Sequence, residues 1–337
     1  MRLLVPDYFN RFKCIADKCR DSCCIGWDMP VDQESIKRYG HIRTDFKSRL
    51  MSGITFTDDG ACFKRTDDGR CVFLECDGLC EICKALGEGS LCRVCKDHPR
   101  YFNLIGDECE GGLGLACEEA ARMILALRKA PTAEISECEA SPEEINADAL
   151  TLVREAREKI IKLIFDESVS PTNIMARLDK YGEALDGVLF DVTCGLVSKP
   201  SVPEIEDSGC GAEILSAARE WMGVLENIEG LDGWQGLLAD AVRASKRDDL
   251  EKLISTGADG YARALLYYFV HRYLICAAVD GDIMPRIRLA ILSCVFICAV
   301  MLWRADTSLE GASTIAKDYS KSVEYSTDNI ELLLSSL

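Results

Sequence analysis

The chain has 337 residues with 19 cysteines, 48% hydrophobic residues and a formal net charge of −17. A chain of this length can bury an ordinary hydrophobic core without disulfide bonds. Nearly all of the excess negative charge lies beyond residue 130, which argues against nucleic acid as a partner. The longest apolar run, 289–303, is shorter than the roughly 18 to 20 residues that span a bilayer, so we expect a buried helix there and no membrane segment.

The N-terminus, MRLLVPDYFNRFK, lacks the apolar run of a secretory signal peptide. We therefore expect a cytoplasmic protein. Thiols stay reduced in that compartment, so closely spaced cysteines indicate a metal or iron–sulfur site more than disulfides. The negative charge is compatible with a basic or lysine-bearing protein partner, and also with an ordinary solvated acidic surface.

The first part of the chain predicts little regular structure. Residues 2–27 show no helical period and contain Pro6 and four cysteines, so we expect irregular chain there. Asp32 is a suitable N-cap for a short helix, and a second helix is expected to end at Gly53. The β-like runs that follow are separated by Asp-Gly turns and predict a small antiparallel meander: 54–57, 61–65 and 71–74.

A second group of short elements leads to residue 130. One helix is predicted at 78–85, with Cys80 and Cys83 on one face. Cys92 and Cys95 are expected in a tight loop. The remaining predicted elements are a hairpin around Gly106-Asp107 and a helix that begins at Cys117 and ends before Pro131.

Residues 131–147 are polar and rich in acids, which predicts a linker. Beyond the linker, apolar residues recur with a helical period and no period-2 run occurs. We therefore expect a mainly α protein, with a cysteine-rich N-terminal lobe of short helices and small antiparallel hairpins followed by an α-helical bundle or array. The predicted domains are 1–130, which binds a metal or iron–sulfur cluster, and 148–337, which is helical.

Thirteen of the 19 cysteines lie before residue 118. A structural zinc or a four-iron cluster needs four protein ligands, or fewer where a cofactor completes the iron shell. Thirteen thiols exceed one such site, so either two metal sites are present or several of these cysteines are core residues. The later cysteines are expected to behave as ordinary residues: Cys138, Cys194, Cys210, Cys276, Cys294 and Cys298.

Cys76, Cys80 and Cys83 have the CxxxCxxC spacing of radical S-adenosylmethionine enzymes. With six cysteines between residues 71 and 95, this spacing can also arise by chance. The chain also lacks the alternating strands and helices of the β/α barrel that normally carries the motif. Both interpretations of the triplet stay open.

The three histidines are weaker candidates. His98 lies near Cys95 and could be a ligand, although an ordinary loop residue is the commoner case. His271 falls on an apolar helix and is expected to be a satisfied core histidine, and His41 is expected at the surface. No nucleophile–histidine–acid set and no dinucleotide-binding glycine motif can be inferred.

Several motifs occur in a characteristic order: CxxxxCxxxCCxxW (14–27), CVFL with GLC (71–80), LGEGSLCRVC with HPR (86–100) and LACEEAARMIL (115–125). Near the C-terminus the chain reads LLYYFVHRYL, RIRLAILS and DYSKSVEYSTDN. Together these motifs resemble the bacterial flagellin lysine-N-methylase family, whose N-terminal part is related to zinc- or iron-chelating cysteine-cluster domains. The resemblance implies S-adenosylmethionine-dependent transfer of a methyl group to lysine Nε of flagellin, with a [4Fe–4S] iron–sulfur cluster involved.

The resemblance also implies a set of metal ligands. Flagellin would be the protein partner, without nucleic acid or membrane, and the oligomeric state is left open. The family's cysteines fall on Cys14, Cys19, Cys23, Cys24, Cys71, Cys80, Cys92, Cys95 and Cys117. Cys83 stands where an aromatic residue is more usual in the family, which weakens the CxxxCxxC interpretation. The cysteines that look additional to the family pattern are Cys62, Cys76 and Cys109.

Two functions stay open at this point. The first is the methyltransferase, in which the lysine must be neutral to attack, so a carboxylate or phenol is expected to orient the amine in a partly desolvated pocket. The second is a non-catalytic, zinc-stabilised scaffold whose helical half binds a protein partner. Pockets favour domain interfaces, so the expected cleft lies at the seam between the cysteine-rich lobe and the helical half. The sequence does not identify the catalytic residues.

Overall fold

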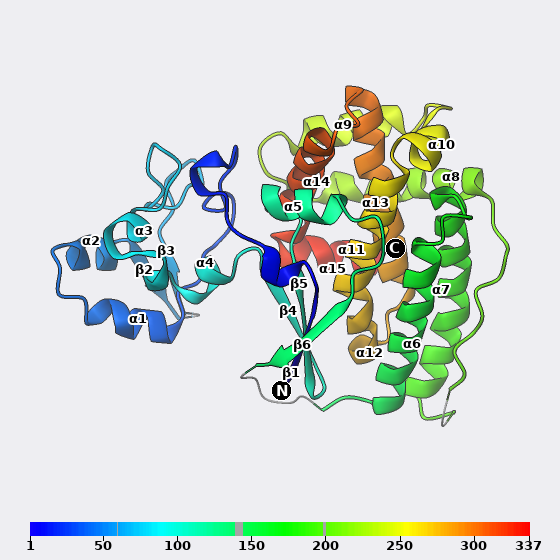
Figure 1. Ribbon diagram of the computed structural model, residues 1–337, viewed down its shortest axis with the longest axis horizontal. Coiled ribbons are helices and arrows are strands. Elements are labelled where there is room, and N and C mark those ends of the chain that lie inside the picture. The colour runs from blue at the N-terminus through cyan, green and yellow to red at the C-terminus, as the bar shows by residue number, and fades with distance from the viewer. Residues whose placement is uncertain (59, 139–143, 198–199) are drawn as a thin grey trace.

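The computed structural model describes residues 1–58, 60–138, 144–197 and 200–337 and is mainly helical (Figure 1). Its strands form one four-stranded and one two-stranded sheet. The predicted fold class, mainly α with small hairpins, is therefore confirmed.

Two separate hydrophobic clusters divide the molecule into a small lobe and a body. The small lobe comprises residues 24–97, and its buried side chains include Tyr39, Leu50 and Phe73. The body comprises residues 1–12 and the chain from Pro99 onward, and Figure 1 shows the small lobe lying to one side of it. Buried residues of the predicted domain 1–130 therefore occur in both clusters. The proposed boundaries at 130 and 148 stay a prediction, and residues 139–143 of the linker lie outside the described residues.

The small lobe is built from short elements. Helix α1 (Gln33–Gly40) begins where the carboxylate of Asp32 accepts the backbone N–H of Ser35 at 2.8 Å, as the N-cap prediction required. The other elements are α2 (Phe46–Ser52), β2 (Ile54–Thr57), β3 (Gly60–Phe63), α3 (Glu81–Leu86) and α4 (Arg93–Asp97).

Two predictions for this lobe are wrong in detail. Residues 71–74 do not form a third strand, because Cys71 and Leu74 make only isolated bridges to Arg65 and Cys80. The segment between Cys92 and Cys95 is not a loop, since Cys92 is the N-cap of the short helix α4. Both errors concern segments too short for a periodic pattern to identify.

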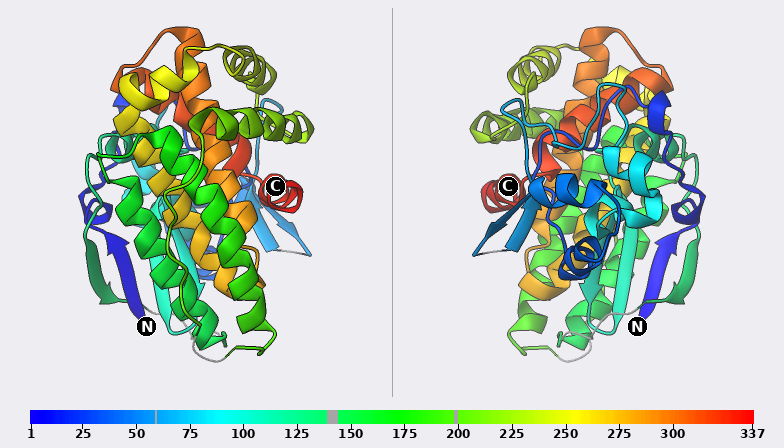
Figure 2. Two further views of the ribbon diagram at one scale, coloured as in Figure 1. Left: turned by 90° about the vertical axis from the view of Figure 1, so that its right-hand side faces the viewer. Right: turned by 90° about the vertical axis from the view of Figure 1, so that its left-hand side faces the viewer.

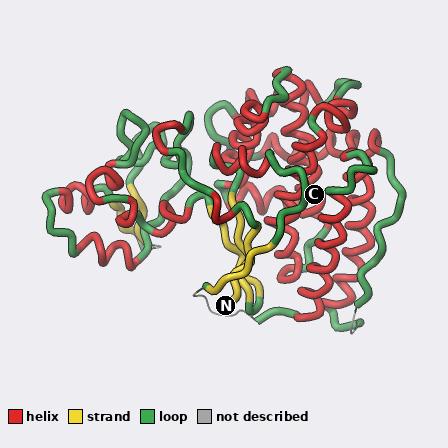
Figure 3. Tube along the Cα trace, viewed as in Figure 1, coloured by secondary structure: helices red, strands yellow, loops and turns green. Residues whose placement is uncertain are grey.

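The four-stranded sheet has the order β4-β5-β1-β6 and lies between the small lobe and the helices (Figure 3). Its strands are β1 (Arg2–Pro6), β4 (Arg100–Ile105), β5 (Glu108–Leu113) and β6 (Ala133–Glu137). The predicted hairpin around Gly106-Asp107 is confirmed as β4–β5. Strand β1 pairs in parallel with β5 and antiparallel with β6. The prediction of irregular chain at 2–27 is therefore corrected for β1, and β6 lies within the predicted linker 131–147.

The remaining elements of the body are helical, as predicted for the chain beyond the linker. Ser170 and Pro171 start α7 as N-cap and first-turn residues, in the expected arrangement. The helices are α5 (Glu118–Leu125), α6 (Ala147–Ile164), α7 (Pro171–Thr193), α8 (Gly211–Trp221), α9 (Trp234–Ala244), α10 (Leu250–Lys252), α11 (Asp259–Tyr273), α12 (Ala277–Asp280), α13 (Met284–Arg304), α14 (Leu309–Glu324) and α15 (Thr327–Ser336).

Helix α13 runs through the centre of the body and packs against α7, α9, α11 and α14. By length and composition it is long and apolar enough to cross a membrane, and 83% of its most apolar window is buried inside the protein. The prediction of a buried helix at 289–303 is confirmed, because the apolar side chains contact neighbouring helices.

Candidate functional site between the two lobes

A cleft of about 1080 Å³ lies between the small lobe and the body. The small lobe contributes the start of α1, the β2–β3 hairpin and α4, and the body contributes β4 and the end of α14. The cleft thus lies mostly between two parts of the predicted domain 1–130, and the helical half, which the sequence expected as the other wall, contributes only Arg272, Glu324 and Tyr325. Side chains from both ends of the chain, Trp27 and Tyr325, meet at its wall.

Aromatic and imidazole rings form this wall. The ring centroids of Trp27 and Tyr325 are 5.4 Å apart, and His98 lies beside both. Nε2 of His98 is 3.1 Å from the Tyr325 hydroxyl. Burial, followed by the nearby charge of Lys321, lowers the pKa of His98 to about 4, so the imidazole is neutral near pH 7. His98 therefore lines the cleft as a neutral imidazole that contacts the Tyr325 phenol.

The floor of the cleft is a buried ionic network centred on Glu324. Its carboxylate, whose side chain is 1% exposed, accepts hydrogen bonds from the hydroxyls of Tyr268 (2.9 Å) and Tyr273 (2.6 Å). Ser320 also donates to it, and Nη1 of Arg272 lies 3.2 Å away. Because its oxygens are satisfied in this way, Glu324 holds the floor together and is not available as a base.

A second pair lies behind β4. The Tyr101 hydroxyl and Nδ1 of His271 are 3.0 Å apart. Burial, followed by the charge of Arg157, lowers the pKa of His271 to about 4. His271 is thus a satisfied core histidine, as expected. His41 is exposed, also as expected.

The structure brings the nine family-matching cysteines into two neighbouring groups that meet at the Cys23-Cys24 pair. In one group, the pKa of Cys117 is raised to about 11. Burial is the largest cause, and the nearby charges of Cys19 and Cys14 also raise it. The members of this group are Cys14, Cys19, Cys23 and Cys117. The members of the other group, in the small lobe, are Cys24, Cys71, Cys80, Cys92 and Cys95.

Within these groups two pairs of thiols contact each other. A hydrogen bond from Cys23 is the largest influence that lowers the pKa of Cys24, to about 7, and the same contact raises the pKa of Cys23. Cys92 and Cys95 show the same relationship, with the pKa of Cys92 lowered and that of Cys95 raised. Each pair therefore favours one thiolate that is stabilised by its neighbour's S–H.

Among the residues that the structure describes, no three His, Cys, Asp or Glu side chains have the geometry of a metal site. The chemistry of the donor set nevertheless fits a sulfur-ligated centre, since it consists of neighbouring soft thiols, of which Cys71 and Cys92 are buried. The assignment of ligands within the set stays a prediction. Of the other cysteines, Cys83 lies beside Cys80, Cys76 is exposed, and Cys294 and Cys298 are buried on α13.

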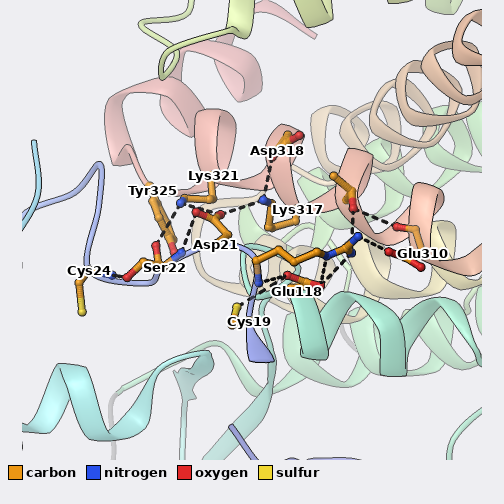
Figure 4. A network of polar contacts seen from close by, with 12 residues as sticks. Cys19, Asp21, Ser22, Cys24, Glu118, Glu310, Lys317, Asp318, Lys321 and Tyr325 are labelled. Atoms are coloured by element: carbon orange, nitrogen blue, oxygen red, sulfur yellow. Dashed lines mark hydrogen bonds and ion pairs between the residues drawn. The ribbon is translucent and has the colours of Figure 1, made fainter. Parts of the chain in front are cut away.

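The segment that carries three thiols of the first group, residues 13–23, is fixed to α14 by ion pairs (Figure 4). Asp21 Oδ2 lies 2.8 Å from Lys317 Nζ and 2.9 Å from Lys321 Nζ. Lys321 also donates to the backbone oxygen of Ser22 at 3.2 Å. Burial opposes ionisation of Asp21, but the two lysines outweigh it and lower its pKa. The thiols of this segment are therefore held against the body by a partly buried carboxylate with two lysine cations.

Sequence reasoning missed Glu324, Tyr325, Lys317 and Lys321. These residues lie in or next to the motif DYSKSVEYSTDN, which was noted only as part of a resemblance. The missing information was the contact of this motif with Trp27, about three hundred residues earlier in the chain.

Fold and site define a mainly α, cysteine-rich protein with a cleft between two lobes. The chain is 29% identical over 132 residues to a lysine-N-methylase of Salmonella typhimurium, which covers 36% of this chain and 31% of that protein. It is 27% identical over 132 residues to the flagellar biosynthetic protein FliU of Salmonella muenchen, covering 36% and 75% of the two chains. The chain thus matches about a third of the length of the lysine-N-methylase.

These likenesses support the resemblance noted in the sequence: the chain is a relative of the flagellin lysine-N-methylase family. No protein-family model matches the chain. No solved structure matches it either.

Proposed function

We propose that this protein is a protein-lysine N-methyltransferase that transfers a methyl group from S-adenosylmethionine to lysine Nε of flagellin. The support for the activity is the likeness to proteins named lysine-N-methylase and FliU. The structural observation that carries the proposal is the interlobe cleft of about 1080 Å³, which is bordered by the Tyr325 phenol next to the thiol groups. We also propose a cytoplasmic location.

The residues of the cleft suit the positioning of a neutral amine. The Tyr325 hydroxyl can donate to the neutral imidazole of His98. Its oxygen then keeps a lone pair that accepts an N–H of the lysine amine and orients the amine's own lone pair into the cleft. The rings of Trp27 and Tyr325 reduce access of water, which favours the neutral amine over the ammonium form.

The net reaction forms one N–C bond and breaks the S–CH₃ bond of the sulfonium. It leaves a thioether, and the substrate ammonium releases one proton to solvent for each methyl group transferred. We propose that four of the nine family-matching cysteines would hold a [4Fe–4S] cluster, with zinc as the alternative metal. When bound, such a cluster supplies a redox-active iron site next to the cleft.

Mass spectrometry of flagellin from cells with and without the gene tests the proposal. We expect lysine masses to increase by one or more methyl groups only when the gene is present. Reconstituted protein with S-adenosylmethionine should give the same modification in vitro, with Cys23→Ser/Cys92→Ser inactive and Cys294→Ser active. Unchanged lysine masses in a flagellated host would instead favour the zinc-stabilised scaffold.

The charge of the chain gives a second readout. The net charge of −17 should help to attract a lysine-bearing protein. We therefore expect KM for the protein substrate to rise as salt increases to about 0.15 M and above, where the Debye length falls below about 8 Å. A KM that does not change with salt would show that this charge plays no part in substrate capture.

A further inference from the structure

Strand β4 is an edge strand of the four-stranded sheet, and one of its sides is free. The two-residue turn Gly106-Asp107 joins β4 to β5, so Ile105 and Glu108 are the residue pair that closes the hairpin, and they hydrogen-bond to each other. Every second pair along the two strands is hydrogen-bonded in the same way, and the pairs in between are not. The backbone N–H and C=O groups of Arg100, Phe102 and Leu104 therefore point away from β5. None of them has a backbone partner within the described parts of the chain.

The side chains of this strand are unusual for a free edge. Phe102 is 42% exposed and Leu104 is 39% exposed, while the alternate residue Ile105 is buried. Soluble proteins normally protect a free edge with charges, proline or a bulge. The opposite edge, β6, follows that rule, because it carries Glu134 and Glu137 and is exposed throughout. The edge of β4 has an open ladder and apolar side chains instead.

The free edge of β4 borders the interlobe cleft. Arg100 and Phe102 line the cleft from the body, and Phe56 on β2, which is 58% exposed, lines it from the small lobe. Figure 2 shows the strands of the large sheet side by side behind the small lobe in the right-hand view. Small-molecule pockets typically measure about 300–1000 Å³. A cleft of about 1080 Å³ with an open strand edge leaves room for a polypeptide segment beside a cofactor.

The unpaired charges of the cleft fit a basic segment. Asp32 accepts two backbone N–H groups and the Ser35 hydroxyl, and neither Asp32 nor Asp58 has an ion-pair partner among the described residues. The guanidinium of Arg100 packs over the rings of Phe9 and Phe12 and likewise has no carboxylate partner in the described chain. The remaining arginines of the lining, Arg93 and Arg272, are paired with Asp97 and Glu324. Two unpaired carboxylates against one unpaired guanidinium favour one added positive charge.

We propose that the free edge of β4 binds an extended, lysine-bearing segment of the substrate protein as an added strand. The backbone groups of Arg100, Phe102 and Leu104 pair with the segment, and Phe102 with Phe56 contacts its apolar side chains. The lysine of the segment is then directed along the cleft towards Tyr325. This inference rests on the proposed function for the identity of the substrate, but the binding itself needs no S-adenosylmethionine.

The probe is a fluorescent peptide of about ten residues, long enough to cover β4, with alternating valine and threonine and one central lysine. Two further versions carry backbone N-methyl groups on alternate residues, one set on the odd positions and one on the even positions. A strand that pairs on one side only loses its hydrogen bonds in one of these versions and keeps them in the other. We expect fluorescence anisotropy to show binding of the parent peptide and of one N-methylated version, with the other at least about tenfold weaker.

The matched protein variants are Phe102→Pro and Phe102→Val. Proline removes the outward N–H without breaking the ladder to β5, and valine keeps the N–H while reducing the side chain. We expect Phe102→Pro to weaken peptide binding by about tenfold or more, and Phe102→Val to weaken it by about threefold. Thermal unfolding shows whether each variant is folded. If Phe102→Pro does not fold, the N-methylated peptides still test the added strand on the native protein.

The outcomes separate this inference from the proposed function. Binding that depends on which alternate set is methylated, without any methyl transfer, supports the added strand and contradicts the enzyme. Methyl transfer that is unchanged in Phe102→Pro and insensitive to both N-methylated sets overturns the added strand and leaves the enzyme in place. Absence of peptide binding, together with a dimer that Phe102→Pro converts to a monomer, also overturns it and assigns the edge to a second copy of this chain.

Discussion

Tyr325, at the end of α14, packs its ring against Trp27 of the N-terminal segment with 5.4 Å between the centroids. The same phenol contacts His98 Nε2 at 3.1 Å and lies near the Cys23 and Cys117 thiols. One side chain therefore contacts the small lobe, lines the cleft and lies near the thiol groups. Its ring and its hydroxyl have separable roles.

Replacing Tyr325 with phenylalanine should keep the ring contact and remove the hydroxyl. We expect kcat for methyl transfer to fall by about tenfold or more with little change in KM, because the amine loses its orienting group. Thermal unfolding should change by about 1 kcal/mol or less. Tyr325→Ala should reduce both stability and activity, since it also removes the contact with Trp27. Full activity of Tyr325→Phe would show that the phenol does not position the amine.

Anaerobically purified protein is expected to contain about four iron atoms and about four acid-labile sulfides per chain. Serine at Cys23 or Cys92 should reduce both values, because each belongs to a contacting thiol pair. Serine at Cys294 should keep the metal and cost about 1–3 kcal/mol of unfolding free energy, because a hydroxyl replaces a thiol buried on α13. Zinc alone in fully active protein, or loss of metal only in Cys294→Ser, would contradict this placement of the site.

Asp21→Asn should destabilise the fold by about 2–4 kcal/mol, because Lys321 would remain largely buried without a carboxylate and Lys317 would keep only Asp318, at 3.1 Å. Asp7→Asn is the matched control, since its ion pair with Arg11 is exposed and should contribute about 0.5 kcal/mol or less. Urea unfolding of the three proteins measures the difference. Equal effects of the two substitutions would show that the buried pair does not fix the N-terminal segment.

His271 should make the protein less stable in mild acid. Its pKa is about 4 in the folded protein against 6.5 for an ordinary histidine, so the unfolded chain binds the proton first as the pH falls. The stabilisation is complete above about pH 6.5 and decreases from there towards pH 4, by at most about 1.4 kcal/mol per pH unit. Tyr101, Arg157 and Glu110 face the ring of His271. The pKa of Glu110 is also lowered, so the stability that its carboxylate contributes is lost at a lower pH than that of His271.

His271→Gln should remove about half of the histidine-dependent slope of unfolding free energy against pH between about 6.5 and 4, because glutamine does not titrate and His98 keeps its own contribution. His41→Gln, at an exposed position, is the control and should leave the curve unchanged. Denaturant unfolding at several pH values tests both variants. A curve for His271→Gln with the native slope would assign the acid sensitivity to other groups.

Local patterns in the sequence were sufficient for most of the helices and for the β4–β5 hairpin. The Asp32 cap, the Gly106-Asp107 turn and the Ser170-Pro171 start act within a few residues, so they can be recognised without tertiary contacts. The buried state of α13 was predictable because apolar residues occupy all of its faces.

The division into lobes could not be predicted in the same way. The chain leaves the body after residue 23 and returns at Pro99, so the small lobe is an insertion between β1 and β4. Strand β1 is defined by pairing with Glu108 and with Glu137, and no pattern within its five residues indicates these partners. For the same reason, the sequence predicted a cleft at a boundary between lobes but did not predict that Tyr325 would line it.

The pairing of β1 also determines the order in which the protein can assemble during translation. Arg2 is synthesised before the small lobe, but its partners Glu108 and Glu137 leave the ribosome only after residues 24–97 have done so. The small lobe has its own hydrophobic cluster and can therefore compact while β1 still lacks its neighbours. Under the proposed function, its thiols can therefore take up metal in the nascent chain before Tyr325 has been synthesised and the wall of the cleft is complete.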